Sequence, residues 1–126
     1  MLIALVLGII SCKRESHNSP LSQMEIARGK IKTGLDYFEI DCGRYPSTAE
    51  NLSALLIRPT DIPERQWHGP YLASMPKDQW GHDYVYRCPG IHNTSQYDLY
   101  SCGPDGVSKS GGDDPDDIPN WIKPEK

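Results

Sequence analysis

Apolar residues recur after position 20 at the spacing of one helical face. They fall at Met24, Ala27, Ile31, Leu35, Phe38 and Cys42, with steps of three or four residues. This is the period of an amphipathic helix that buries one side. Either Ser19 or Ser22 can cap its start, because serine is a favoured N-cap residue, and Gly43 is suited to its end. The pattern therefore predicts a helix that begins near residue 19 or 22 and ends at residue 42.

The remaining pattern predicts a second, short helix and a hairpin. Ser47 and Glu50 have the spacing of a capping box just before a group of leucines. Residues 83–88 and 96–102 alternate between apolar and polar positions, which is typical of strands. Antiparallel pairing of these two segments would place Cys88 beside residue 97. The proline-rich stretch 58–79 carries three large apolar side chains, so it is expected to be an ordered loop; these are Trp67, Tyr71 and Leu72.

The first residues have the features of an export signal. Residues 2–10 are apolar apart from Gly8, which is about half the length that spans a bilayer. Ile9-Ile10-Ser11-Cys12 resembles the bacterial lipobox, whose cysteine is lipidated. We therefore predict a signal peptide over residues 1–11, a lipid-anchored linker over 12–21 and a globular domain over 22–126. An ordinary cleaved signal and a short buried strand of a cytosolic protein are the alternatives.

Length and composition narrow the class of protein. The chain has 126 residues with 11 glycines and 11 prolines, and 37% of its residues are apolar. It is expected to form one loop-rich domain with a small core, which needs a covalent staple or a bound ion for stability. The net charge is −4 and no basic stripe is present, so nucleic acid is not an expected partner.

The acidic charge is concentrated near the C-terminus. Five aspartates fall within a glycine-rich segment of 13 residues: Asp105, Asp113, Asp114, Asp116 and Asp117. Ca²⁺ takes six to eight oxygen ligands from carboxylates and backbone carbonyls of such flexible loops. The spacing of an EF-hand is absent, and a solvated acidic run is the alternative. The segment is therefore a candidate calcium site.

The cysteines suggest one disulfide. If Cys12 is lipidated, three cysteines remain in an exported protein. Cys88 and Cys102 would lie toward opposite ends of the hairpin, beyond the reach of a disulfide. Cys42 must then pair with one of them, and we prefer Cys42–Cys88.

The histidines give no sign of catalysis. All four lie in segments predicted as loops or linker, at His17, His68, His82 and His92. No nucleophile motif accompanies them, so they are expected to be solvated and the protein is not expected to be an enzyme.

Five segments, in order along the chain, resemble signatures of the major pseudopilin family of bacterial type II secretion. The segments are Asp41-Cys42-Gly43-Arg44-Tyr45-Pro46, Trp67-His68-Gly69-Pro70-Tyr71-Leu72, Pro76-Lys77-Asp78-Gln79-Trp80-Gly81, residues 84–86 with Tyr97-Asp98-Leu99-Tyr100-Ser101-Cys102-Gly103-Pro104-Asp105-Gly106, and Asp116-Asp117-Ile118-Pro119-Asn120-Trp121. The resemblance extends from about residue 26 to residue 121.

This resemblance implies a fold and a ligand set. The fold class is α+β, with a long N-terminal helix packed on a small antiparallel sheet and a C-terminal loop ordered by Ca²⁺. The implied ligands are the side chains of Asp105, Asp116 and Asp117 and the carbonyls of Cys102 and Val107. The possible further ligands, in a slightly longer loop, are Asp113 and Asp114.

The resemblance does not include the polymerising stem of pseudopilins. A short apolar run that ends in a lipobox-like cysteine stands in its place. We therefore expect a lipid-anchored, periplasm-facing envelope protein that associates with type II secretion components or pseudopilins. Two alternatives remain open: a genuine pseudopilus subunit with a truncated N-terminus, and a calcium-dependent module that binds glycan or peptide on exposed Trp67, Trp80 and tyrosines.

Overall fold

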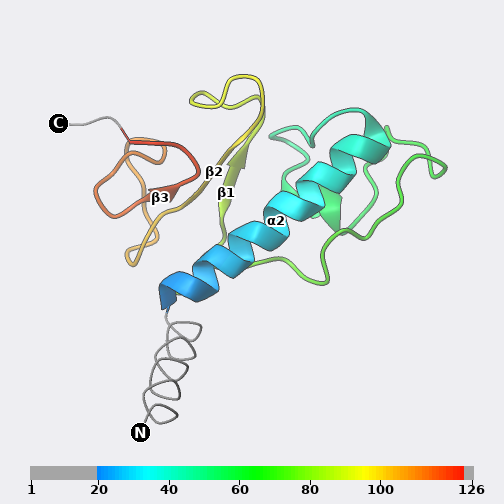
Figure 1. The fold of residues 1–126 in the computed structure, drawn as a ribbon. Helices are drawn as coiled ribbons and strands as arrows, with labels where there is room; N and C mark the ends of the chain where they lie inside the picture. The colour runs from blue at the N-terminus through cyan, green and yellow to red at the C-terminus, as the bar shows by residue number, and fades with distance from the viewer. Residues whose placement is uncertain (1–19, 124–126) are drawn as a thin grey trace, which may run out of the picture.

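The long N-terminal helix is the dominant element of the fold (Figure 1). In the computed structural model, which describes residues 20–123, helix α2 runs over Pro20–Cys42. Its predicted inner face is confirmed, since Ile31, Leu35 and Phe38 have no exposed surface, whereas Ile40 is 73% exposed. Gly43 ends the helix with φ of 79° and donates its N–H to the Glu39 carbonyl, a geometry that suits glycine.

The predicted export signal, its lipidated Cys12 and the linker up to residue 19 lie outside the described residues. Within residues 20–123, no helix is both long and apolar enough to span a bilayer.

A small antiparallel sheet lies beside the helix (Figure 1). Its strands are β1 (Val85–Arg87), β2 (Asp98–Ser101) and β3 (Ile118–Pro119), in the order β1-β2-β3. The partner of Val85 is Tyr100 and the partner of Arg87 is Asp98. Extended by one pair, this register would place Cys88 opposite Tyr97, in line with the pairing that the hairpin pattern predicts. The α+β class is therefore confirmed, and β3 is an addition that the sequence pattern did not predict.

The second helix is shorter and later than predicted. Ser47 and Glu50 do form the reciprocal bonds of a capping box, with Ser47 N to Glu50 Oε1 at 2.8 Å and Glu50 N to Ser47 Oγ at 3.2 Å. These bonds close a turn rather than a helix. The 3₁₀ helix η1 (Leu52–Leu55) begins after Asn51, whose side chain accepts the N–H of Leu52.

The proline-rich loop is ordered by its apolar anchors, as predicted. Trp67 donates its indole N–H to the Ala54 carbonyl at 3.0 Å. Its ring meets the Tyr71 ring edge-on, with centroids 5.6 Å apart. The Tyr71 hydroxyl donates in turn to Asp41 at 2.7 Å. Trp67, Tyr71 and Leu72 all pack against the hydrophobic core, which includes residues of α2 and η1.

The predicted Cys42–Cys88 disulfide is wrong for this structure, in which Cys42, Cys88 and Cys102 are all free thiols. The sulfur of Cys88 donates to the Gln96 carbonyl at 3.5 Å, across the hairpin. The Cys42 thiol instead lies beside the side chains of Tyr71 and Asp41. Each thiol is thus held against different partners.

Candidate metal centre

Strand pairing brings the two ends of the acidic segment together. Ser101, the last residue of β2, pairs with Ile118, the first residue of β3. Cys102 follows β2 directly, and Asp116 and Asp117 come just before β3. The loop between these strands, drawn from orange to red in Figure 1, therefore returns its aspartates to the turn after β2.

The close approach of these two segments depends on glycine. Gly103 has φ of 76°, a region in which other residues are strained. A Cβ atom there would also collide with the backbone oxygen of Asp116 and crowd its carboxylate. Partial burial and the adjoining carboxyl groups of Asp105 and Asp117 raise the pKa of Asp116. The turn after β2 and the end of the loop thus place three carboxyl groups side by side.

Asp117 is the buried member of the group, with only 3% of its surface exposed. Its Oδ2 atom accepts the Ser108 hydroxyl at 2.5 Å and the Asp114 backbone N–H at 2.9 Å. Its Oδ1 atom is buried and has no hydrogen-bond partner. A buried carboxylate oxygen without a hydrogen-bond donor is costly, so this atom is available to bind a cation.

Asp114 completes the acidic cluster. Asp114, Asp116 and Asp117 each offer a carboxylate oxygen, and these oxygens lie within 4.8 Å of one another. The Ser110 hydroxyl and the Lys109 backbone N–H lower the pKa of Asp114, so its carboxyl group is ionised. Like charges at this separation repel unless a cation lies between them.

The two predicted backbone ligands, Cys102 and Val107, flank the turn over residues 103–106. Cys102 is buried. Burial and the charges of nearby carboxylates, Asp117 first among them, raise the pKa of its thiol. Val107 donates its N–H to Asp105 Oδ1 at 3.0 Å and so fixes the side chain of Asp105. Cys102 therefore borders the carboxylate cluster, and Val107 lies against Asp105.

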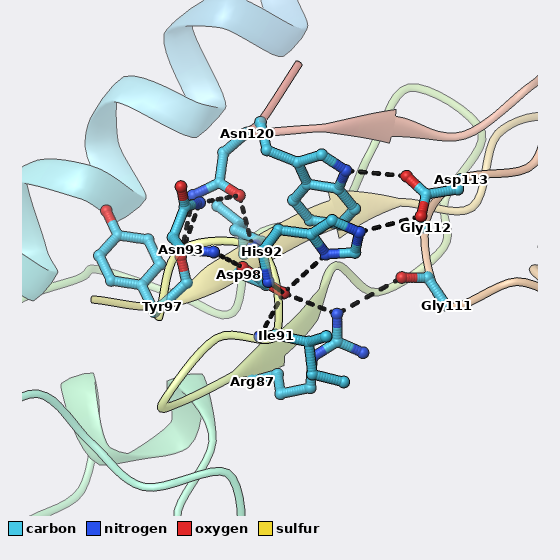
Figure 2. Close-up of polar contacts among 12 residues, drawn as sticks. Arg87, Ile91, His92, Asn93, Tyr97, Asp98, Gly111, Gly112, Asp113 and Asn120 are labelled. Atoms are coloured by element: carbon cyan, nitrogen blue, oxygen red, sulfur yellow. Dashed lines mark hydrogen bonds and ion pairs between the residues drawn. The ribbon is translucent and has the colours of Figure 1, made fainter. Parts of the chain in front are cut away.

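The side chain of Asp113 faces His92 (Figure 2). Its Oδ1 accepts the Trp121 indole N–H at 2.8 Å, and its Oδ2 lies 2.9 Å from Nε2 of His92. Of the five aspartates, the structure clusters Asp114, Asp116 and Asp117, places Asp105 beside Asp116 and gives Asp113 to a different network.

Two residues of the site were not anticipated from the sequence. His92 was expected to be solvated, but its ring stacks on Trp121 with centroids 3.9 Å apart. Ser108 was not singled out, although its hydroxyl bridges Asp117 and the Gly112 N–H. No local motif marks either residue: the His92–Trp121 contact joins distant segments, and Ser108 reaches Asp117 across the loop.

The donor set fits a hard cation. Ca²⁺ prefers carboxylate and carbonyl oxygens on a glycine-rich loop, and this site supplies clustered carboxylates with one unpartnered buried oxygen at Asp117. A softer metal would need a thiolate ligand. The cysteine at this cluster is Cys102, and its raised pKa favours the protonated thiol instead.

Comparison with known proteins identifies the family. Residues 13–121 match the family described as Type II secretion system (T2SS), protein G. The chain is 37% identical to the Type II secretion system core protein G of Pseudomonas aeruginosa, over 96% of this chain and 89% of that protein. It is 31% identical to the protein of the same name from Vibrio cholerae, over 96% and 86%.

A solved structure agrees. The crystal structure of the major pseudopilin from the type 2 secretion system of enterohaemorrhagic Escherichia coli is similar with a TM-score of 0.66 and 32% identity. The match covers 89% of this chain and 92% of that one. The chain therefore belongs to the type II secretion system protein G family.

Proposed function

We propose that this protein is a structural, non-enzymatic component of type II secretion in the bacterial cell envelope, which assembles with pseudopilins or other components of that system. The observation that carries the proposal is the family match over residues 13–121. The fold agrees with it, since the same helix and sheet occur in a major pseudopilin.

Gene deletion tests this role. Loss of the gene from its host should leave proteins in the periplasm that the parent strain releases to the medium. Restoring the wild-type gene should restore their release. An unchanged set of released proteins in the deletion strain would refute the role in secretion.

We also propose that the acidic loop binds one Ca²⁺ ion that stabilises the fold. The side chains of Asp105, Asp116 and Asp117 and the carbonyls of Cys102 and Val107 would hold it, with Asp114 as a further ligand. Support comes from the unpartnered buried oxygen of Asp117 and from the mutual approach of the carboxylates. A bound cation would offset their repulsion and tie the loop to β2 and β3.

Thermal unfolding tests the calcium proposal. At a Ca²⁺ concentration 100 times Kd, binding stabilises the folded state by about 2.7 kcal/mol. This corresponds to a rise in Tm of about 10–20 °C over the EDTA sample for a domain of this size. Asp105→Ala should remove the difference between the two samples, whereas Asp61→Ala, at an exposed carboxylate far from the loop, should keep it. Equal Tm values for the wild type in Ca²⁺ and in EDTA would contradict the proposal.

The proposed anchor is a lipid at Cys12, which would place the domain on the periplasmic face of a membrane. Its support is the lipobox-like run Ile9-Ile10-Ser11-Cys12. Mass spectrometry of the mature N-terminus decides the matter. An acylated Cys12 as the first residue is the expected result, and a chain that still carries residues 1–11 would overturn it.

A further inference from the structure

His92 joins the hairpin to the acidic loop (Figure 2). We call His92 and its three side-chain partners, Asp98, Asp113 and Trp121, the clamp. His92 belongs to the connection between β1 and β2. Its Nδ1 atom is 3.1 Å from Asp98 Oδ2 and its Nε2 atom is 2.9 Å from Asp113 Oδ2. Its ring is stacked on Trp121 at an interplanar angle of 7°. The imidazole therefore contacts three side chains from two separate segments.

On the hairpin side of the clamp, a network of hydrogen bonds surrounds the Asp98 carboxylate. Asp98 is completely buried, and its carboxylate accepts bonds from Arg87 Nη2 and from the backbone N–H groups of Ile91, His92 and Asn93. The connection is wrapped so closely around Asp98 that a Cβ on Gly90 would collide with its carboxylate. The backbone that carries His92 is thus held in place by its hydrogen bonds to Asp98.

On the acidic-loop side of the clamp, the two partners of His92 are hydrogen-bonded to each other. Trp121 donates its indole N–H to Asp113 at 2.8 Å, so the two residues that contact His92 also contact each other. Asp113 stands directly before the carboxylate-bearing segment 114–117, and Trp121 follows it by four residues. The ligand segment is therefore held at both ends by one imidazole ring.

We propose that His92 is a positioning residue for the calcium-binding loop, a role that rests on the calcium site proposed above. Without contacting the ion, His92 would fix the spacing of Asp114, Asp116 and Asp117 through Asp113 and Trp121. A loop that is already ordered loses less conformational entropy when it binds. Groups that orient metal ligands from outside the coordination shell typically change metal affinity by about 10–100-fold when removed.

Calcium titration of the full-length chain tests this inference. His92→Ala should weaken the Kd for Ca²⁺ by at least about tenfold, although every proposed ligand remains. His92→Gln should recover part of the affinity, since its amide can still donate toward Asp113. The matched control is Thr48→Val, because Thr48 makes two hydrogen bonds with the Cys88 backbone, at the β1 end of the connection rather than at the acidic loop. This control should lose stability and keep the wild-type Kd.

A second variant tests the clamp if His92→Ala does not fold. Trp121→Phe keeps an aromatic ring for stacking but removes the indole donor to Asp113. It should weaken the Kd in the same direction. A wild-type Kd in His92→Ala, or in Trp121→Phe where His92→Ala is unfolded, would overturn the positioning role and leave the calcium site standing. Absence of Ca²⁺ binding by the wild type would overturn the calcium site and this inference with it.

Discussion

Replacement of Asp98 by asparagine should destabilise the protein more than any exposed charge change. Asp98 is fully buried and faces only donors: the Arg87 guanidinium at 2.7 Å, the His92 ring at 3.1 Å and three backbone N–H groups. Although burial opposes it, the bonds from Arg87, Asn93 and His92 hold the pKa of Asp98 well below its usual range. The carboxylate is therefore ionised at neutral pH.

Asparagine has the same shape but turns an amide N–H₂ toward these donors and removes the charge that pairs with Arg87. Removing one partner of a buried ion pair typically costs about 3–5 kcal/mol. At about 4–8 °C per kcal/mol for a domain of this size, Asp98→Asn should lower Tm by at least about 12 °C.

Urea unfolding followed by far-UV circular dichroism measures the loss of stability. The control is Asp83→Asn, since Asp83 pairs with Lys77 at 2.5 Å but is 69% exposed, and such pairs contribute about 0–1 kcal/mol. A cost below about 1 kcal/mol for Asp98→Asn would refute the view that this carboxylate organises the hairpin.

Three further predictions concern the core, pH and glycine. Leu35→Ala empties a fully buried position and should cost about 2–5 kcal/mol in urea unfolding. The Arg44 guanidinium lowers the pKa of Glu50 from 4.5 to about 2, so the folded state gains stability above pH 4.5 and loses it as pH falls toward 2. The free energy of unfolding, measured in urea from pH 2 to 6, should therefore vary less with pH in Glu50→Gln than in the wild type. The difference should be roughly 1–2 kcal/mol over this range, after allowance for the partial exposure of Arg44. Gly103→Ala should destabilise the fold and weaken Ca²⁺ binding, whereas Gly29→Ala, in an open helical position, should stabilise it by up to about 1 kcal/mol; the opposite order in thermal melts would contradict the packing described.

The elements that the sequence predicts well are those with their own periodicity. The face of α2 is visible in the sequence because Ile31, Leu35 and Phe38 follow the helical period and are all buried. The hairpin register follows from alternation in both strands. Strand β3 has two residues, Ile118–Pro119, and is a strand only because β2 lies beside it, so no local pattern could reveal it.

The site divides in the same way. A group of aspartates on a glycine-rich loop is apparent from composition. Which of these aspartates join the cluster, and which bind elsewhere, is not. Asp113 leaves the cluster because His92, 21 residues earlier, and Trp121, eight residues later, both contact it. The disulfide prediction failed for a related reason: counting cysteines takes no account of where Cys42 and Cys88 point, which tertiary contacts decide.

Calorimetric titration of the wild-type chain with Ca²⁺ tests the central claim most directly, with Asp117→Asn as the comparison because Asp117 carries the unpartnered buried oxygen. One Ca²⁺ ion bound per wild-type chain, and none or far weaker binding in Asp117→Asn, is the expected result. Absence of binding by the wild type, or equal affinity in the two proteins, would contradict the assignment of the acidic loop as a calcium site.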